Sequence, residues 1–410
     1  MIIADLHLHS KHSRATSKYL SFDNLEKYGR MKGLDLLGTG DFQHPIHLET
    51  IKNELTEDDK GILWTKNKYP FLLQTEISLM FSKEGRRAVH LVMLAPNVEV
   101  AGQVQEKLLQ KGRIDYDGRP IFGMMPAEFV EIMKEISNKI EIFPAHCMTP
   151  WFGVFGSKSG FDTIKDCFED KAKEINAIET GLSADPEMLW RNDDWNKFNL
   201  ISTSDAHSFW PWRLGREATI FEGELSYDNI LKAIRTGEGL KETIEVDPGY
   251  GKYHIDGHRN CGVSFEPKES KDLGNKCPKC GKELIIGVLN RVEELANHEE
   301  GYRPSNAKEF KRLIPLQELI GSVYGIKQLS SVRVWKEYDK LIKGFGNEFK
   351  ILLESSEEEL KKVVNEKLAK LIILNRKNEF EIKPGYDGVY GELILKEEYK
   401  IKKQKSLGEF

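Results

Sequence analysis

Short apolar segments alternate with longer amphipathic segments over residues 1 to about 240. Seven of the short segments have the length and apolar content of buried strands: 1–9, 34–41, 71–78, 88–96, 140–147, 174–180 and 199–207. The segments between them place apolar residues at helical spacing, as in 125–139. Strand–helix alternation predicts parallel strands joined by right-handed crossovers. Seven such units favour an α/β barrel of about seven strands over an open sheet.

The pattern changes near residue 245. Residues 244–292 are rich in Gly and Pro and have few long apolar runs, and from about 290 the pattern becomes helical. Ser356 and Glu359 have the spacing of a capping box, and an apolar face follows it at Leu360, Val363, Val364, Leu368, Leu371 and Ile372. Residues 379–396 read as two strands around a Gly-rich turn. We therefore expect four parts: 1–243, a small module 244–292, a mainly helical region 293–400 and a tail 401–410.

Composition excludes several classes of protein. The chain has 410 residues, of which 40% are hydrophobic, and no apolar run approaches 18 residues, so we expect no transmembrane helix. The N-terminus lacks the features of a signal peptide. Five cysteines, an odd number, fit a reducing compartment, so a cytoplasmic protein is expected. A net charge of −5 excludes a globally basic nucleic-acid binder.

Potential metal ligands follow the predicted strands at their carboxyl ends. In "DLHLHS", residues 5–10, strand geometry places Asp5, His7 and His9 on one face and two leucines on the other. The other candidates are Asp41, His44, Glu76, His90, His146, Asp205 and His207. In an α/β barrel these ends meet at one mouth, and so many converging side chains need cations to compensate them. His and carboxylate ligands suit two or three Zn²⁺, Mn²⁺, Fe²⁺ or Mg²⁺ ions. Whether Asp41 or His44 is the ligand in its segment stays open.

A second metal site is predicted in the small module. His258 and Cys261 are spaced like Cys277 and Cys280, and 15 residues separate Cys261 from Cys277. Three cysteines and one histidine give the four ligands of a closed, structural zinc site. His254 is the rival fourth ligand, and a redox pair at Cys277 and Cys280 is the alternative reading of the last two cysteines.

The ordered ligand motifs resemble the polymerase and histidinol phosphatase (PHP) family. The matching residues are His7 and His9, Asp41 or His44, Glu76, His90, His146, and the D-x-H pair Asp205 and His207. The resemblance implies a distorted (β/α)7 barrel and a multinuclear metal site for phosphoester hydrolysis. Within that site we expect His7, His9, Glu76 and Asp205 to carry catalysis.

The whole chain also resembles the endonuclease Q family. The stretches that carry this resemblance are "GTGDFQHP", "TGLSADPEM", "SDAHSFWPWRLGREA", "YHIDGHRNCGV" and "PGYDGVYG". The resemblance implies an archaeal-type DNA repair enzyme that nicks 5′ of uracil, hypoxanthine, xanthine or an abasic site. Its products would carry 3′-hydroxyl and 5′-phosphate ends.

Such an enzyme must extract the damaged base and inspect its edge. Candidate residues for the base are Trp151 and Phe152, which could stack, Glu179, which could accept a hydrogen bond, and Gly181, whose segment could donate one. Trp210 and Trp212 either wedge into the base stack or pack. Arg213 and Arg216 either hold phosphate oxygens or form structural ion pairs. Residues 308–345 hold eight Lys or Arg and four Asp or Glu, a surplus of four positive charges that suits a DNA backbone.

The last residues resemble a sliding-clamp interaction box. Gln404, Leu407 and Phe410 are spaced three apart, as in the box that binds PCNA, but the box normally ends in two aromatic residues. A charged tail with chance spacing is the alternative. Two rival functions remain for the whole chain: a small-molecule phosphatase of the histidinol-phosphate type, and a non-catalytic repair scaffold that binds the clamp.

Overall fold

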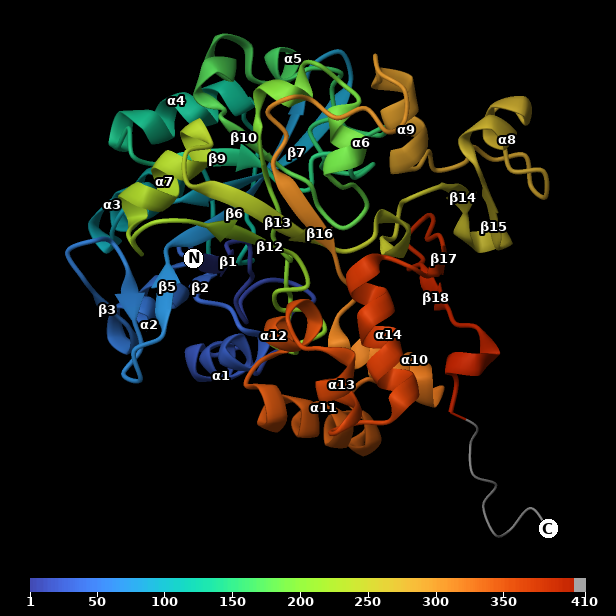
Figure 1. Ribbon diagram of the computed structural model, residues 1–410. Helices are drawn as coiled ribbons and strands as arrows, with labels where there is room; N and C mark the ends of the chain where they lie inside the picture. Colours follow the sequence, from blue (N-terminus) through green and yellow to red (C-terminus); the bar gives the residue numbers. More distant parts are fainter. Residues whose placement is uncertain (402–410) are drawn as a thin grey trace.

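The computed structural model of the chain describes residues 1–401 (Figure 1). Its largest sheet has eight strands in the order β16-β13-β12-β1-β2-β5-β4-β3, and a second has the order β8-β6-β7-β9. Three further pairs are β10-β11, β14-β15 and β17-β18. The strands are β1 (Ile2–Asp5), β2 (Leu36–Gly38), β3 (Thr56–Glu57), β4 (Leu63–Trp64), β5 (Pro70–Leu72), β6 (Gln74–Ser82), β7 (Arg86–Leu94), β8 (Ile121–Phe122), β9 (Glu141–Pro144), β10 (Ala177–Glu179), β11 (Asn199–Ile201), β12 (Ala218–Phe221), β13 (Leu240–Glu245), β14 (Asp256–His258), β15 (Val263–Phe265), β16 (Glu309–Arg312), β17 (Glu381–Lys383) and β18 (Glu392–Ile394).

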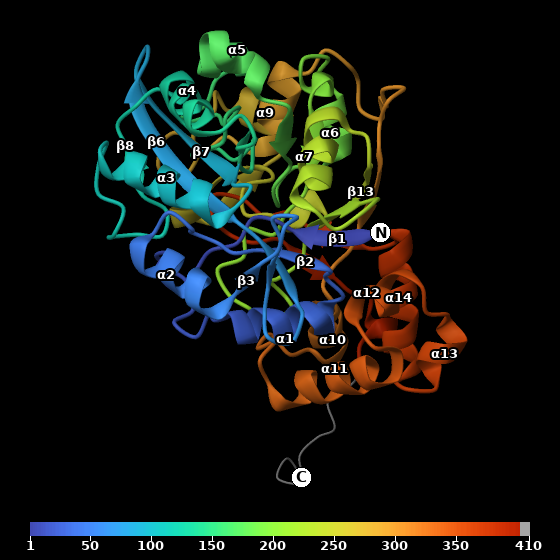
Figure 2. The ribbon, with the colours of Figure 1, turned by 90° about the vertical axis from the view of Figure 1, so that its left-hand side faces the viewer.

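Helices surround the strands of the first half of the chain and form most of the last quarter (Figures 1 and 2). They are α1 (Phe22–Lys32), α2 (Pro45–Glu54), α3 (Val98–Leu109), α4 (Pro126–Ile136), α5 (Ile164–Phe168), α6 (Pro186–Trp190), α7 (Tyr227–Thr236), α8 (Pro267–Asp272), α9 (Val288–Leu295), α10 (Leu316–Tyr324), α11 (Val332–Phe345), α12 (Glu348–Leu353), α13 (Glu357–Lys361) and α14 (Glu366–Lys377). No helix among residues 1–401 has both the length and the apolar character needed to cross a membrane.

All seven predicted strand segments contain a strand, but their pairing is mixed. The pairs β1–β2, β2–β5 and β10–β11 are parallel, as predicted. The pairs β6–β7, β7–β9 and β1–β12 are antiparallel, so the prediction of parallel pairing is wrong there. The β6–β7 pair is a hairpin whose strands are joined by residues 83–85, and so short a connection reverses the chain and allows only antiparallel pairing.

Hydrogen bonds also link strands that belong to different sheets. The Cys147 amide after β9 donates to the Glu179 carbonyl of β10, at 2.9 Å. The Ser202 amide after β11 donates to Thr219 Oγ1 of β12, at 3.0 Å. Strand β5 continues almost directly into β6, so the chain passes there from the eight-stranded sheet into the four-stranded one. Leu6 and Leu8, which alternate with the histidines of the first motif, are buried as predicted.

The largest sheet extends beyond the first domain in sequence. Strand β16 pairs in parallel with β13, from Glu242 opposite Glu309 to Glu245 opposite Arg312. The expected boundary at 243/244 therefore falls inside β13, and a strand from the predicted helical region completes the edge of the first domain's sheet. Residues between these two strands form the projecting part that contains α8, β14 and β15, on the right in Figure 1.

The C-terminal helices form a compact group below the sheets in Figure 1. The predicted capping box is confirmed, since Ser356 and Glu359 exchange backbone and side-chain hydrogen bonds at the start of α13. The single helix implied by the apolar face is wrong: α13 ends at Lys361, and Asn365 caps a new helix, α14. Both helices still bury their predicted apolar residues, such as Leu360 and Leu368.

A buried ion pair joins this helical group to the first domain. Lys32, at the end of α1, lies 2.7 Å from Glu348 of α12, and both side chains are almost fully buried. Lys32 also donates to the Pro211 carbonyl at 2.8 Å. Glu348 accepts hydrogen bonds from the Leu316 amide and from the Tyr338 hydroxyl, at 2.9 and 3.0 Å. Every polar atom of the pair thus has a partner, and the partners come from both parts of the chain.

We expect Glu348→Ala to lower the free energy of unfolding by about 3–5 kcal/mol, because it leaves a buried ammonium without its charge partner. Glu49→Ala, which removes an exposed partner of Lys52, should change it by less than about 1 kcal/mol. Chemical denaturation measures both values. Equal stabilities of the two variants would show that the buried pair does not hold the helical group in place.

The hairpin β17–β18 attaches to the loop that leads into the small module. The Gly385 amide donates to the Gly249 carbonyl at 2.9 Å, and the Gly388 amide to the Lys252 carbonyl at 3.0 Å. The Gly391 amide donates to the Tyr250 carbonyl at 3.2 Å. A Cβ at Gly391 would lie 2.1 Å from the Gly249 oxygen, so a side chain there would prevent this approach. The predicted pair of strands is confirmed, and it is fixed at a distant part of the chain.

Candidate metal centre and substrate groove

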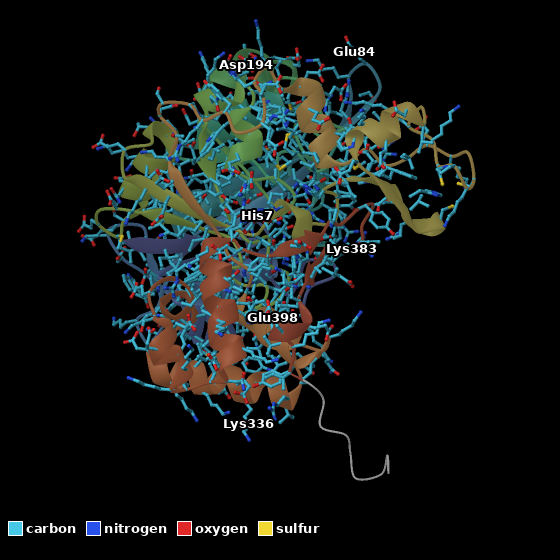
Figure 3. All side chains as sticks on the ribbon, turned by 45° about the vertical axis from the view of Figure 1, so that its right-hand side comes forward. His7, Glu84, Asp194, Lys336, Lys383 and Glu398 are labelled. Atoms are coloured by element: carbon cyan, nitrogen blue, oxygen red, sulfur yellow. The ribbon has the colours of Figure 1, made fainter. Side chains whose placement is uncertain are left out.

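Two groups of potential metal ligands lie side by side at the strand ends of the first domain. One group consists of His7, His9, Glu76 and Asp205, and the other of Glu76, His90 and His146; within each group the ligand atoms lie within 4.8 Å of one another. The structure therefore brings six of the predicted ligands together from β6, β7 and the segments after β1, β9 and β11. Figure 3 shows His7 in the interior of the molecule.

Glu76 belongs to both groups and connects them. Its Oε2 lies 3.1 Å from His9 Nε2 and 3.6 Å from His7 Nε2. Its Oε1 lies 2.8 Å from His90 Nδ1 and 3.3 Å from His146 Nε2. The carboxylate is fully buried in the long strand β6. With one oxygen facing each group, it has the arrangement of a carboxylate that can bridge two cations.

The electrostatics of the groups favour charged carboxylates and a neutral imidazole. Burial alone would raise the pKa of Glu76, but His90, Arg119 and His7 lower it well below its usual value. Burial likewise opposes ionisation of Asp205, yet His207, His9 and His7 bring its pKa well below the ordinary range. Burial lowers the pKa of His90 to about 4, whereas the facing carboxylates overcome burial and raise the pKa of His7, His9 and His146. Metal binding would therefore have to displace protons from these three rings. Ionised carboxylates and neutral imidazoles are the forms that ligate divalent metals.

The polar atoms inside the groups show whether these residues suit a divalent metal ion. His7 Nε2 is buried and has no hydrogen-bond partner among the described residues, although it faces Glu76 and Asp205. A buried ring nitrogen without a partner is costly, and a divalent cation would satisfy it together with both carboxylates. The residues present therefore fit a metal centre.

A further layer of side chains fixes the orientation of the histidines. Glu179 Oε1 lies 2.8 Å from His7 Nδ1, which leaves Nε2 of that ring directed into the first group. Asp41 Oδ1 lies 3.2 Å from His9 Nδ1, while its Oδ2 accepts from the Ser10 amide at 2.6 Å. Thr149 Oγ1 lies 2.9 Å from His146 Nδ1. Such partners set the ring orientation and tautomer of metal-binding histidines.

Glu179 and Asp41 thus lie in positions that the sequence did not indicate. Glu179 was a candidate for reading a base, but its two oxygens already contact His7, Thr203 and the His146 amide. Asp41 was a candidate ligand, and it lies behind His9, outside both groups. In this structure both carboxylates orient histidines.

Three of the site residues have unusual backbone conformations. Asp41, His146 and Asp205 have φ values of 39°, 31° and 46°, in the left-handed region that side chains other than glycine rarely adopt. These residues lie two to four positions beyond the ends of β2, β9 and β11. A conformation of this kind costs on the order of 1 kcal/mol and is typical of functional sites.

Two predicted ligands lie apart from the groups. His207 borders them, with its ring centroid 4.4 Å from that of His9 and its Nδ1 3.0 Å from the Asp205 carbonyl oxygen. His44 precedes α2 and stacks on His12 at 4.3 Å, and its Nε2 lies 3.3 Å from the Asp115 carbonyl oxygen. His44 caps α2, which begins at Pro45, and it lies outside both groups, so its role as a ligand stays a prediction.

The structure also reveals a cation that the sequence did not indicate. Arg119 Nη1 lies 3.0 Å from Glu76 Oε2, and the side chain is 29% exposed toward the solvent. The residue precedes the short strand β8 in a polar loop, where no strand-end pattern marks it. Its guanidinium could contact a substrate phosphate next to the metal groups.

The two groups open into a groove of about 890 Å³. Its lining contains many predicted substrate residues together with residues from distant parts of the chain: His90, His146, Trp151, Phe152, Glu179, Gly181, Asp205, His207, Arg213, Arg216, Arg119, Lys252, Tyr253 and Tyr390. Phe152 stacks on His90 at 4.2 Å, whereas Trp151 is 45% exposed at the groove. An open, positively lined groove beside the ligand groups suits an extended anionic substrate.

The structure places the two tryptophans and the two arginines predicted to bind substrate in different surroundings. Trp210 and Trp212 stack on each other at 5.2 Å and pack against Trp335 of α11, so the structure shows packing at the base of the helical group. Arg216 donates twice to the Ser204 carbonyl, at 3.0 and 3.1 Å, and is buried. Arg213 faces the groove and lies over the ring of Tyr390.

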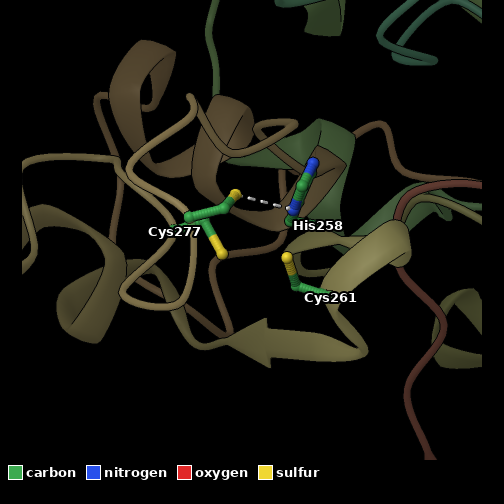
Figure 4. A group of neighbouring side chains, drawn as sticks. His258, Cys261 and Cys277 are labelled. Atoms are coloured by element: carbon green, nitrogen blue, oxygen red, sulfur yellow. Dashed lines mark hydrogen bonds between the residues drawn. The ribbon is translucent and has the colours of Figure 1, made fainter.

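The four predicted zinc ligands form a separate group in the projecting module. His258, Cys261, Cys277 and Cys280 come together there, and Figure 4 shows the labelled side chains directed toward a common centre. Cys280 Sγ lies 3.5 Å from His258 Nδ1. Although burial raises the pKa of Cys277, backbone amides of Lys279 and Cys280 lower it to about 6, which favours the thiolate that binds metal. His254, the rival ligand, is not in the group.

The remaining predicted site lies outside the described residues. Gln404, Leu407 and Phe410 follow Ile401, whose amide donates to the Val323 carbonyl at 2.8 Å.

The predicted basic surface includes Lys336, which Figure 3 shows on the outer side of the C-terminal helices.

Comparisons with known proteins identify related sequences in an archaeon and a bacterium. Residues 315–379 match the model of the MJ0043 C-terminal domain family. The chain is 35% identical to MJ0043 of Methanocaldococcus jannaschii over 257 residues, which covers 61% of this chain and 32% of that protein. It is 28% identical to YqxK of Bacillus subtilis over 412 residues, 96% of this chain and 99% of that one. The chain thus spans about a third of the length of MJ0043 and nearly all of YqxK.

Two solved structures are similar over their whole length. One is the lesion-specific endonuclease PfuEndoQ from Pyrococcus furiosus, with 31% identity, a TM-score of 0.86, and coverage of 100% of this chain and 99% of that one. The other is an endonuclease Q in complex with a 27-mer duplex carrying an abasic lesion at the active site. That structure has 32% identity, a TM-score of 0.88 and coverage of 99% of both chains. At this identity over both full lengths, the chain belongs to the endonuclease Q family.

Proposed function

We propose that this protein is a metal-dependent endonuclease that nicks DNA 5′ of deaminated bases and abasic sites. The observation that carries the proposal is the pair of ligand groups joined by Glu76 at the floor of an open groove. A related endonuclease Q binds duplex DNA with an abasic lesion at its active site, which supports the same substrate class here. The order of strands around the centre supports a distorted (β/α)7 barrel of the PHP type.

Each side chain has a role that follows from its position. His7, His9, Glu76 and Asp205 would hold one cation, and His90 and His146 would hold a second with Glu76. Bound Zn²⁺, Mg²⁺ or Mn²⁺ would supply Lewis-acid charge that neutralises the phosphate and makes water more acidic. Glu179 and Asp41 fix the histidine rings, and Arg119 offers a further positive charge at the same side of Glu76.

The upper part of the groove would receive the extruded nucleotide. Trp151 is exposed there and can stack on a base, while Phe152 is committed to His90. Deamination replaces an amino donor by a carbonyl acceptor, so a backbone N–H near Gly181 would favour uracil over cytosine.

Two further proposals concern other parts of the chain. His258 and the three cysteines would hold one structural zinc, and residues 404–410 would bind the sliding clamp.

The lesion specificity is tested with end-labelled duplexes that are identical except at one base. We expect nicks 5′ of uracil, hypoxanthine, xanthine and an abasic site in the presence of Mg²⁺ or Mn²⁺. Undamaged cytosine or adenine should be cut at least about 10-fold more slowly, because an unsatisfied buried group costs about 1–3 kcal/mol. Ligation and primer extension identify the 5′-phosphate and 3′-hydroxyl ends.

A small phosphate monoester serves as the parallel substrate. Equal cleavage of cytosine and uracil strands would remove the lesion-reading part of the proposal. Efficient hydrolysis of the monoester without any nicking would instead favour a small-molecule phosphatase.

A further inference from the structure

Two cations in the substrate groove form no ion pair among residues 1–401. Arg119 pairs with Glu76, and Arg216 donates to the Ser204 carbonyl. By contrast, the side chains of Arg213 and Lys252 make no ion pair and no hydrogen bond with any of residues 1–401, although both line the groove and are half-buried. The buried carboxyl group of Glu318 interacts electrostatically with Arg213 but forms no ion pair with it. Partly desolvated cations that form no ion pair are unfavourable, so this part of the groove is suited to an anion.

Both cations lie over the same aromatic ring, that of Tyr390. The Arg213 guanidinium carbon lies 5.2 Å from the centroid of the Tyr390 ring, and Lys252 Nζ lies 4.7 Å from it. Contacts of this kind stabilise a cation without neutralising it. Burial opposes ionisation of the Tyr390 phenol, but Arg216, Arg213 and Lys252 together lower its pKa, which shows how positive the surroundings are.

Backbone hydrogen bonds fix the position of the segment that carries Tyr390. Tyr390 lies in the hairpin between β17 and β18, which is bound through backbone hydrogen bonds to residues 249–252. The Gly388 amide donates to the carbonyl of Lys252, so the hairpin and one of the cations are directly connected. Tyr390 also borders Leu182, next to Gly181 at the proposed base pocket. The arrangement is therefore part of the wall of the groove.

Resting on the proposed function, we propose that Arg213, Lys252 and Tyr390 form a subsite for the backbone phosphate that adjoins the scissile phosphate. The scissile phosphate itself would lie at the two ligand groups. A DNA strand in the groove brings the neighbouring phosphate close to it, and two unpaired cations held on one ring offer that phosphate hydrogen bonds and charge. The C-terminal hairpin thereby contributes to substrate binding at the first domain.

The subsite is tested by removing the charge on either side of the contact. The full-length protein cleaves lesion duplexes in which one phosphate at a time, on each side of the scissile bond, is replaced by a neutral methylphosphonate. Arg213→Ala and Tyr390→Ala are compared with the wild type, and Arg303→Ala is the matched control. Arg303 also lies over an aromatic ring, that of Trp190 at 5.3 Å, but outside the groove.

On the unmodified duplex we expect kcat/KM to fall about 10- to 100-fold for Arg213→Ala and Tyr390→Ala. Arg303→Ala should remain at the wild-type value. At one neighbouring position, the methylphosphonate should lower wild-type cleavage by a similar factor and lower cleavage by the two variants no further. Tyr390→Phe, which keeps the ring, should retain most of the activity. Metal content and melting temperature should be unchanged in all variants.

The experiment distinguishes failure of the subsite from failure of the proposed function. A wild type that cuts lesion DNA while the variants cut it equally well would overturn the subsite alone. The same conclusion follows if the methylphosphonate and the substitutions act additively at every position, because the side chains then do not contact the replaced phosphate. A wild type that cuts no lesion duplex would overturn the proposed function and the subsite with it.

Discussion

Glu76→Gln should reduce nicking of uracil-containing DNA by about 1,000-fold or more. Glu76 has one oxygen facing each ligand group, so the substitution removes a negative charge from both groups at once. Cations at such a site supply several kcal/mol of charge stabilisation in the transition state, and each 1.36 kcal/mol corresponds to a factor of ten in rate. Single-turnover cleavage and metal analysis of the purified protein measure the two consequences.

Binding of lesion DNA should persist in this variant, because the groove cations are unchanged. Glu141→Gln is the matched control: Glu141 is also a fully buried strand carboxylate, but it pairs with Arg235 away from the groove. It should nick DNA at nearly the wild-type rate even if its stability is lower. Normal nicking by Glu76→Gln with a full complement of metal would refute the proposed centre.

Cys277→Ser should release one zinc ion and unfold the projecting module while the rest of the protein stays folded. The module between β14 and α9 has short strands and many exposed residues, so little apolar burial supports it. Structural zinc contributes on the order of 10–16 kcal/mol in small zinc-binding domains, far more than such a module can replace. Metal analysis gives the zinc loss, and hydrogen exchange locates the unfolded segment.

Cys167→Ser is the control for this experiment. Cys167 is buried in α5 and belongs to no ligand group among the described residues, so the variant should keep all its zinc. Retention of every zinc ion by Cys277→Ser would exclude the four-ligand site. Equal protection of the module in the two proteins would show that zinc does not hold it folded.

The strand-end ligands could be predicted because a strand has a period of two. Once "DLHLHS" was read as a strand, His7 and His9 had to share a face, and the ends of neighbouring strands had to meet. The same reasoning located Glu76, His90, His146 and Asp205. The sequence pattern could not distinguish metal ligands from residues that orient them. Asp41 and Glu179 are carboxylates like the ligands Glu76 and Asp205. Only the three-dimensional structure shows that they contact ring nitrogens of His9 and His7 instead.

Other features depended on tertiary structure that has no local pattern. His44 caps α2 and lies outside both groups, and Arg119 reaches Glu76 from a loop without periodicity. Strand β16 lies in a segment that reads as helical and polar, and it forms because the edge of β13 is available for pairing. Trp210 and Trp212 have the aromatic character of a base-stacking wedge, yet they pack on each other and on Trp335 of α11.

The attachment of the β17–β18 hairpin has a consequence for how the protein is made. The ligand groups come from the first 205 residues, whereas Tyr390 reaches the groove from near the end of the chain. During synthesis on the ribosome, the first domain can fold and assemble its ligands long before residue 390 has been added. The wall of the groove is complete only when the hairpin has emerged and bound to residues 249–252. A nascent or truncated chain would therefore hold the metal ligands without the complete substrate groove, and full activity would begin only with a nearly finished polypeptide.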